Sequence, residues 1–326
     1  MSPVKYMYSR RAVLRMLGFF SAVTACPSWA FNRVTDDRGY TLTLTEVPRR
    51  IAAISYFGAD AAIALGAQVV ASTYMVRNRH SSYLFDRLTQ AKPLGQRASP
   101  NLEWLALARP DLIVAMQRYS EANATRLSRI APYMALRLET FGDSDRSVRL
   151  MGQALGCSAL ALSLNQKFSH ARRRLSQRAQ PLKRIHYVFI WGGGSAPWAF
   201  YNENMTCTII NALGGINIAG GNPTPDVPEN TAFEMSLEAL LAADPDVIFV
   251  YDYGVSRVFE TNPIWPYLTA VRQGRVVYVQ DHWIESFGPI ARHLVLHEAA
   301  HALYPEQFPA VDVSQTVAHY LHSLST

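Results

Sequence analysis

One sequence phrase occurs twice in the chain, and both copies predict the same local structure. In the first copy, Asn-Leu-Glu-Trp-Leu at residues 101–105 leads to Arg-Pro-Asp and an apolar run at residues 109–114. In the second, Ser-Leu-Glu-Ala-Leu at residues 236–240 leads to Asp-Pro-Asp and an apolar run at residues 244–250. Each copy is typical of a helix with an early glutamate, a tight turn and a buried strand. The repetition predicts two equivalent lobes, and 326 residues suffice for two domains of ordinary size.

Short apolar runs alternate with helical patterns along both halves of the chain. After a hairpin expected at 40–45, the pattern predicts strands at 51–55, 69–73, 111–115, 185–191, 247–251 and 276–279. It predicts helices at 59–65, 102–108, 207–213, 237–243 and 293–303. Alternation of this kind favours βα units and parallel sheets.

The segment between the two halves has a different pattern. Apolar residues recur at helical spacings from 144 to about 179, which predicts one long helix. We therefore expect an α/β fold in which two Rossmann-like βα lobes are joined by a single long α-helix. The expected parts are an N-terminal lobe at 31–143, the linking helix at 144–182 and a C-terminal lobe at 183–326.

Residues 1–30 are typical of an export signal. They contain four basic residues and no acidic one, followed by an apolar stretch too short for a stable membrane anchor. The pair Arg10 and Arg11 resembles a twin-arginine signal, although a general secretory signal is the alternative. We expect cleavage after Ala30 and a periplasmic protein; the competing site is a lipobox ending at Cys26, which would leave a lipid anchor.

Removal of the signal changes what the charge of the chain implies. The whole chain has a net charge of +6, whereas the remainder has 27 basic and 25 acidic residues. Such a small excess does not favour a nucleic-acid partner, and the arginines at 172–174 are typical of a solvated helix end. Cys157 and Cys207 would remain, and the sequence leaves open whether they form a disulfide.

Further phrases strengthen a family resemblance. Besides the repeated phrase, they are Pro-Arg-Arg-Ile at 48–51, Ala-Leu-Gly at 64–66, Asn-Pro-Ile-Trp at 262–265 and residues 270–276. Over nearly all of 45–308 the chain resembles the periplasmic binding proteins for ferric siderophores, ferric citrate, haem and vitamin B12. Residues 95–103 look most like the ferric citrate and ferric hydroxamate branch.

The resemblance implies a function as well as a fold. A protein of this kind binds its ligand between the lobes and delivers it to the permease dimer and ATPase of an ABC importer. It has no catalytic step, acts as a monomer and needs no cofactor or metal of its own, because the ligand carries the iron. We expect the ligand to be a ferric chelate, either a siderophore or a ferric citrate-like complex; haem or cobalamin is the alternative.

Candidate ligand-binding residues follow from the expected sheets. In open α/β sheets, ligands bind beyond the carboxyl ends of the strands. The loops there are cationic and aromatic, and both types suit a chelate whose outer oxygens carry negative charge. The candidates are Tyr56, Arg77, Arg97, Arg118, Tyr119, Trp191, Trp198, Tyr251 and Trp283.

The resemblance adds roles for three of these candidates. Arg97 lies where hydroxamate binders place an arginine against the iron-bound oxygens. Tyr119 and Trp283 align with a binding tyrosine and a binding tryptophan.

Two departures from the hydroxamate pattern put that ligand in doubt. No aromatic partner is found at the matching position near Asn230, and Glu285 stands where hydroxamate binders have another aromatic residue. The additional arginines Arg77 and Arg118 favour a more anionic, citrate-type chelate.

Glu103 and Glu238 occupy matching places in the repeated phrase. In the family, one glutamate from each lobe docks on arginines of the permease, so the resemblance gives both residues that role. A glutamate near a helix start is also favoured by the helix dipole alone.

One motif suggests a different class of protein. His297, Glu298 and His301 fit H-E-x-x-H, the signature of zinc metallopeptidases. A third ligand is not evident, because only Glu306 and His319 lie nearby. A metallopeptidase therefore stays a remote alternative.

Overall fold

The structure of the chain is a computed structural model, and it describes residues 32–76, 79–227 and 230–324. The predicted signal, with Arg10, Arg11, Ala30 and Cys26, lies outside these residues, as does Arg77. In the described part, none of the helices combines the length and the apolar character needed to cross a bilayer.

The N-terminal lobe is built on a parallel sheet of five strands. They are β3 (Arg50–Ile54), β4 (Gln68–Ser72), β5 (Lys92–Pro93), β6 (Leu112–Met116) and β7 (Tyr133–Leu136), in the order β5-β4-β3-β6-β7. Its helices are α1 (Tyr56–Ala64), α2 (Leu102–Leu107), α3 (Gln117–Ser120) and α4 (Ala124–Ser128). β3 and β6 are almost wholly buried, as expected for central parallel strands covered on both faces.

The C-terminal lobe contains a mixed sheet. Its strands are β8 (Ile185–Trp191), β9 (Trp198–Phe200), β10 (Gly215–Asn217), β11 (Ala232–Glu234), β12 (Val247–Tyr251) and β13 (Val276–Val279). The order is β11-β9-β8-β12-β13, with β10 also pairing β8. β8, β12, β13 and β10 are parallel, whereas β9 and β11 are antiparallel additions. The helices are α7 (Met205–Ala212), α8 (Leu237–Ala243), α9 (Thr269–Arg272), α10 (Pro289–Leu303) and α11 (Val313–His322).

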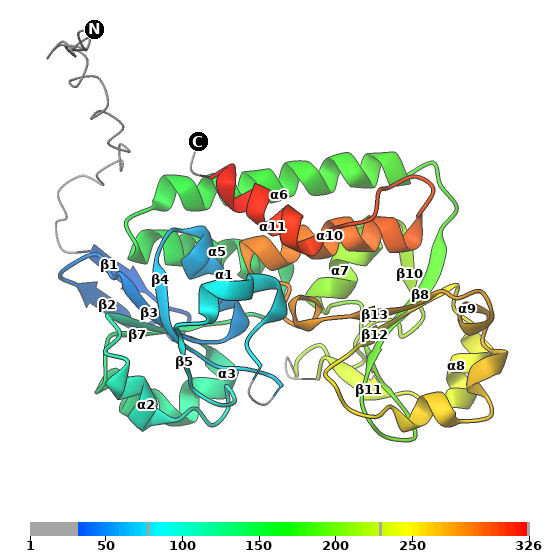
Figure 1. Cartoon of the computed structure of the whole chain (residues 1–326), viewed down its shortest axis with the longest axis horizontal. Helices are drawn as coiled ribbons and strands as arrows, with labels where there is room; N and C mark the ends of the chain where they lie inside the picture. The colour runs from blue at the N-terminus through cyan, green and yellow to red at the C-terminus, as the bar shows by residue number, and fades with distance from the viewer. Residues whose placement is uncertain (1–31, 77–78, 228–229, 325–326) are drawn as a thin grey trace, which may run out of the picture.

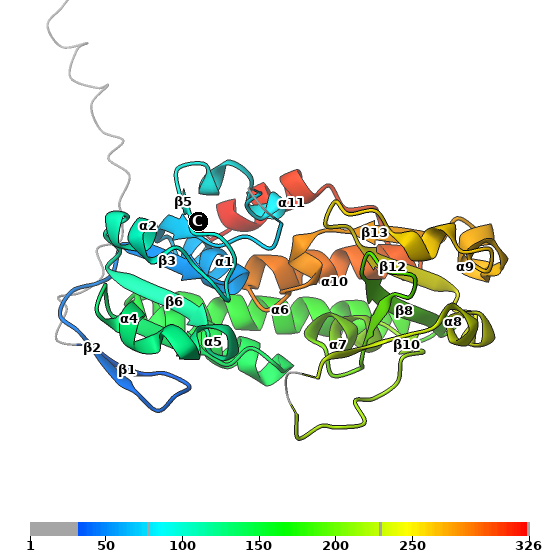
Figure 2. The same cartoon turned by 90° about the horizontal axis from the view of Figure 1, so that it is seen from below.

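The two lobes lie side by side, and one helix runs along both of them (Figure 1). This helix is α6 (Ser158–Ala179), which packs against α5 (Phe141–Ala154), α7 and α10. Viewed from below, α6 again extends from one lobe to the other (Figure 2). The predicted two-lobed α/β fold is confirmed.

The prediction of one continuous helix over 144–179 is wrong in its first part. The chain forms two helices, α5 and α6, which pack against each other, and only α6 bridges the lobes. The break falls at Gly156, which has a φ of +68°. This left-handed backbone conformation costs glycine little, because glycine has no Cβ. Gly152 permits close packing, because a Cβ there would lie 2.3 Å from the Cβ of Ala161. The apolar spacing continues across the break and therefore did not reveal it.

Other differences from the predicted elements are small. The hairpin consists of β1 (Asn32–Thr35) and β2 (Thr41–Leu44), so it begins earlier than expected. β8, α8, β12 and β13 have the predicted bounds. The strands β5, β7, β9, β10 and β11 and the helices α3, α4, α9 and α11 were not predicted. Cys157 precedes α6, Cys207 is buried in α7, and the two do not form a disulfide with each other.

Candidate functional site: a cavity between the lobes

A cavity of about 330 Å³ lies between the lobes, where the strands of both sheets end. Met116 ends β6, and Arg118 follows it in α3. Leu138 and Glu139 follow β7, Trp191 ends β8, and Tyr251 ends β12. The placement agrees with the general position of ligands in open α/β sheets. The remaining lining residues are Met75, Arg97, Tyr119, Phe200, Asn204, Met205, Thr231, Tyr253, Ile284, Glu285 and Phe287.

Arg97 reaches the cavity from the N-terminal lobe and is held by three contacts. Its guanidinium forms an ion pair with Glu285, and Nη2 donates to the Tyr119 hydroxyl at 3.2 Å. The guanidinium carbon also lies 4.1 Å from the centre of the Tyr119 ring. Burial lowers the pKa of Arg97. Tyr119 and Glu285 therefore hold the guanidinium in place at the cavity wall.

Arg118 has a similar arrangement on the same side of the cavity. Its Nη1 donates to Glu139 Oε2 at 2.8 Å, and its guanidinium lies 4.8 Å from the centre of the Tyr119 ring. The Nε–H group is buried and has no partner within the described residues. Tyr119 is thus in cation–π contact with both arginines.

The C-terminal lobe contributes an aromatic wall. The Trp191 ring lies 6.4 Å from Tyr253 at 61° and 6.5 Å from Phe200 at 27°. Tyr251 stacks on Tyr253 with ring centres 5.4 Å apart. The Trp191 indole N–H is buried and has no hydrogen-bond partner in the described part of the chain.

Tyr251 is oriented by a hydrogen bond to Asp281. Its hydroxyl donates to Asp281 Oδ1 at 2.8 Å. Burial raises the pKa of Tyr251, and the neighbouring Asp281 carboxylate raises it further. The phenol therefore stays neutral and presents its ring to the cavity.

Four of the nine predicted ligand-binding residues lie away from the cavity lining or outside the described chain. Tyr56 is 2% exposed, and its hydroxyl accepts the Met75 N–H at 2.8 Å. Trp283 is 1% exposed and packs on Phe249 in the core, with ring centres 4.9 Å apart. Trp198 is exposed on β9 next to Trp191, and Arg77 lies outside the described residues. We therefore leave Tyr56, Trp283 and Trp198 out of the site proposed below.

The structure adds lining residues that the sequence did not identify as part of the site. The most important are Glu139 and Glu285, the partners of the two arginines. Glu139 follows the unrecognised strand β7, so its position beyond a strand end was hidden. Glu285 had been noted only as a departure from an aromatic pattern. Met75, Met116 and Met205 carry no signal in a single sequence, because methionine is common in cores.

Glu103 and Glu238 are exposed in the first turns of α2 and α8. Asn101 caps α2 and Ser236 caps α8 through the same side-chain contact with a backbone N–H. Both helices lie on the side of the molecule opposite α6, one at the outer end of each lobe (Figure 1). The repeated phrase therefore forms equivalent surfaces in the two lobes.

The H-E-x-x-H residues do not form a metal centre. Glu298 Oε2 is contacted by His282 Nε2 at 2.6 Å and by Trp283 Nε1 at 2.8 Å. His297 packs on His293, whereas His301 Nδ1 lies 2.9 Å from the Phe308 carbonyl oxygen. Burial lowers the pKa values of His293, to about 3, and of His297. Across residues 32–76, 79–227 and 230–324, no three His, Cys, Asp or Glu side chains are grouped to bind a metal.

The chain is similar to curated binding proteins over most of its length. It is 26% identical to the Fe(3+) dicitrate-binding periplasmic protein FecB of Escherichia coli, over 86% of this chain and 92% of that protein. It is 24% identical to the achromobactin-binding periplasmic protein of Dickeya dadantii, over 78% of this chain and 86% of the relative.

Solved structures share the fold. The complex of Staphylococcus aureus SirA with staphyloferrin B superposes with a TM-score of 0.67 at 21% identity, over 83% of this chain and 98% of that one. The petrobactin-binding protein YclQ of Bacillus subtilis gives a TM-score of 0.70 at 17% identity, over 85% and 99%. The family model described as "Periplasmic binding protein" matches residues 51–282. This chain therefore belongs to the periplasmic binding protein family of ABC transporters, whose members bind substrates and are not enzymes.

Proposed function

We propose that this protein captures a ferric chelate, a siderophore or a ferric citrate-like complex, in the cavity between its lobes. The observation that carries the proposal is the composition of that cavity. Arg97 and Arg118 line one part of it, and the aromatic rings of Trp191, Phe200, Tyr251 and Tyr253 line another. A wrapped ferric ion offers anionic oxygens to the arginines and apolar surface to the rings.

The relatives support the same ligand class. FecB is named for ferric dicitrate and the Dickeya protein for achromobactin, and the SirA structure contains staphyloferrin B. All three are similar to this chain over more than three-quarters of its length. The proposed site comprises Arg97, Arg118, Tyr119, Trp191 and Tyr251 from the sequence candidates.

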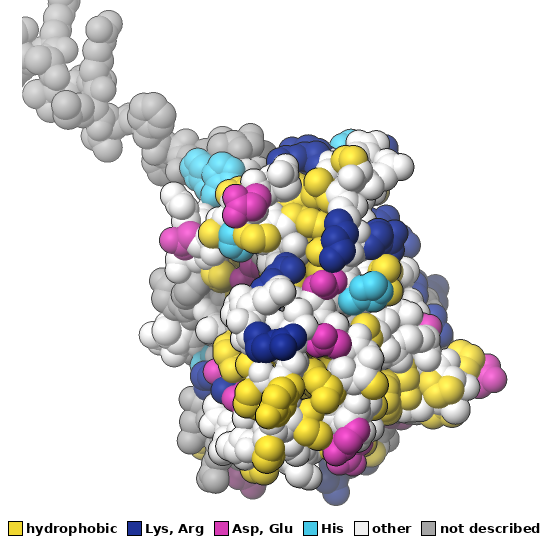
Figure 3. Space-filling view, turned by 90° about the vertical axis from the view of Figure 1, so that its right-hand side faces the viewer, with side chains coloured by type: hydrophobic (Ala, Val, Ile, Leu, Met, Phe, Trp, Pro, Cys, Tyr) yellow, Lys and Arg dark blue, Asp and Glu magenta, His cyan; other side chains and the backbone are white. Residues whose placement is uncertain are grey.

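Delivery is the second half of the proposal. The protein, as a monomer, docks on the permease dimer of an ABC importer through Glu103 and Glu238. Two observations support this docking role: both glutamates are exposed, and they occupy equivalent positions at the outer ends of the two lobes. Basic and acidic side chains are interspersed on the described part of the face in Figure 3, which suits a solvated surface and not a nucleic-acid groove.

The proposed location is the periplasm, after export by residues 1–30. Some relatives are named as periplasmic proteins and others as lipoproteins. Both cleavage after Ala30 and a lipid anchor at Cys26 are therefore compatible with the proposal. The lobes are proposed at 31–154 and 183–326, in place of the expected 31–143 and 183–326. Because α5 belongs with the N-terminal lobe by its packing on β1 and α1, the linking segment is chiefly α6.

Intrinsic tryptophan fluorescence tests the capture step, because Trp191 lines the cavity. Purified protein is titrated with ferric dicitrate, a ferric trihydroxamate, a ferric tricatecholate, haem and cobalamin. A saturable change with a ferric chelate, absent with the iron-free chelator, is expected. Trp104→Phe, on exposed α2, is the matched control and should keep the signal, whereas Trp191→Phe should lose most of it. Binding of haem or cobalamin alone would contradict the proposal.

A further inference from the structure

Each arginine of the cavity is paired with a glutamate that also lines it. Arg97 pairs with Glu285, and Arg118 pairs with Glu139 at 2.8 Å. These four are the charged side chains among the described lining residues. Two positive and two negative charges cancel, so the described lining residues together carry no net charge. Counting arginines in the sequence alone had favoured an anionic ligand.

The Glu285 carboxylate is a fixed part of the site. Its side chain is 2% exposed, and its Oε2 accepts the buried Tyr56 N–H at 2.8 Å while its Oε1 faces Arg97. A carboxylate held by a backbone N–H and a guanidinium does not swing into solvent.

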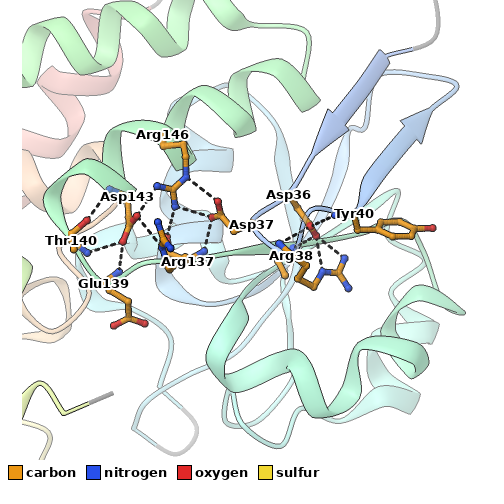
Figure 4. Close-up of polar contacts among 10 residues, drawn as sticks. Asp36, Asp37, Arg38, Tyr40, Arg137, Glu139, Thr140, Asp143 and Arg146 are labelled. Atoms are coloured by element: carbon orange, nitrogen blue, oxygen red, sulfur yellow. Dashed lines mark hydrogen bonds and ion pairs between the residues drawn. The ribbon is translucent and has the colours of Figure 1, made fainter. Parts of the chain in front are cut away.

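Glu139 is held through its backbone. Asp143 Oδ2 accepts the N–H groups of Glu139 at 3.1 Å and Thr140 at 2.9 Å. Asp143 is in turn bound by Arg146, which also pairs with Asp37 beyond β1. Figure 4 shows this network leading from the hairpin to Glu139. The main chain that presents the second carboxylate is therefore fixed as well.

Most of the remaining lining is apolar or aromatic. It comprises three methionines, Leu138, Ile284, two phenylalanines and the rings of Tyr119, Trp191, Tyr251 and Tyr253. Asn204 and Thr231 are the uncharged polar residues of the described lining. Such a wall stabilises an apolar ligand surface and leaves a surplus ligand charge without a counter-charge.

We propose that the ligand is a ferric chelate of low net charge with a largely apolar outer surface, and that Glu139 and Glu285 set this selectivity. The inference rests on the proposed function and narrows it. The arginines still donate to chelate oxygens, while the paired carboxylates repel a polyanionic complex. They also accept hydrogen bonds from hydroxyl, amide or ammonium groups at the chelate's edge.

The test compares chelates that differ in charge. Ferric trihydroxamate is neutral, ferric tricatecholate is trianionic, and ferric dicitrate is also anionic. Wild-type protein is expected to bind the neutral complex at least about tenfold more tightly than either anionic complex, since uncompensated charge in a partly buried site costs about a factor of ten or more. Raising the salt concentration should change the affinity for the neutral complex little.

Charge-removing variants test the role assigned to the glutamates. Glu139→Gln keeps the shape and removes one negative charge, and Glu306→Gln, at an exposed position after α10, is the matched control. We expect Glu139→Gln to shift the ratio of affinities toward the anionic complexes by about tenfold, with an effect of salt on those complexes. Glu285→Gln should act in the same direction; if it fails to fold in a thermal melt, Glu139→Gln alone carries the test.

The outcomes separate this inference from the function on which it rests. If no ferric chelate binds, the proposed function fails. If wild type binds an anionic chelate more tightly than the neutral one, chelate binding stands and the low-charge inference is overturned. An unchanged ratio of affinities in folded Glu139→Gln removes Glu139 from the selectivity mechanism and overturns the inference for that residue.

Discussion

Asp60 connects the two halves of the molecule through a contact that can be tested directly. It lies in α1 and is fully buried. Its two carboxylate oxygens accept the N–H groups of Ile290 at 2.9 Å and Ala291 at 2.8 Å, in the first turn of α10, and one also accepts the Tyr83 hydroxyl at 3.0 Å. First-turn N–H groups have no partner within their own helix. Because the N-cap residue of α10 is Gly288, which has no side chain, Asp60 caps the helix from another part of the fold.

Replacing this carboxylate should destabilise the protein strongly. Asp60→Ala leaves two N–H groups and a phenol without partners in the interior, and each such group costs about 1–3 kcal/mol. Allowing for relaxation, we expect a loss of about 3 kcal/mol in the free energy of unfolding at pH 7, measured by urea denaturation. The melting temperature should fall by roughly 6–12 °C. Asp60→Asn keeps one acceptor and should lose about half as much.

Gly288 provides a matched double-mutant cycle. A Cβ at Gly288 would lie 2.2 Å from the Asp60 carboxyl carbon, although its φ of −71° suits any residue. Gly288→Ala should therefore destabilise wild type through a steric clash and cost much less in an Asp60→Gly background, which removes both the carboxyl group and the Asp60 Cβ that would lie 2.6 Å away. A cost below about 1 kcal/mol for Asp60→Ala, or equal costs of Gly288→Ala in both backgrounds, would refute the capping role.

The same residue predicts a pH dependence with a definite sign. Burial raises the pKa of Asp60 to about 6, against the opposing effect of its hydrogen bonds. The native state therefore binds this proton more tightly than the unfolded chain. The resulting contribution to stability is present below about pH 4 and is lost as the pH rises through about 6. The stability of wild type relative to Asp60→Asn should fall by up to about 3 kcal/mol from pH 4 to pH 7; a constant difference would contradict the raised pKa.

Three further predictions concern binding and delivery. Arg97→Ala should weaken ferric chelate binding by about 10- to 100-fold in calorimetry, and it should also lower the apo melting temperature, because Glu285 is then buried without its ion-pair partner. Glu103→Ala combined with Glu238→Ala should leave chelate affinity within about twofold and sharply reduce uptake through the cognate permease; normal uptake would remove both residues from docking. Small-angle scattering with and without ligand should give nearly equal radii of gyration, because α6 spans both lobes and resists a hinge motion. A clear fall in the radius of gyration on binding would contradict this prediction.

Local sequence patterns were sufficient for much of the architecture. The buried strands β8 and β12 and the helix α8 have strong apolar patterns bounded by glycine, proline or aspartate, so their bounds were predicted correctly. The strand-end rule also brought Arg97, Arg118, Tyr119, Trp191 and Tyr251 to one cavity. The rule works because it depends on chain direction and not on side-chain packing.

The same patterns gave wrong predictions where one local signal is compatible with two different structures. Helical spacing of apolar residues continues past Gly156, and only the close packing of α5 on α6 shows that the chain reverses there. Trp283 follows a strand, as a ligand residue would, yet it lies in an apolar cluster with Phe189 and Phe249. An indole ring suits a core and a binding site equally well.

By itself, therefore, the sequence determined the two-lobed α/β fold, the family and the candidate loops, because periodicity, turns and repeats are properties of neighbouring residues. Only the tertiary structure decided the electrostatics of the cavity. Arg97 meets Glu285 across 188 positions of sequence, and Glu139 is fixed by a network that begins beyond β1. Charge compensation depends on distances of a few ångströms between side chains that are far apart in the chain, and no local pattern encodes such distances.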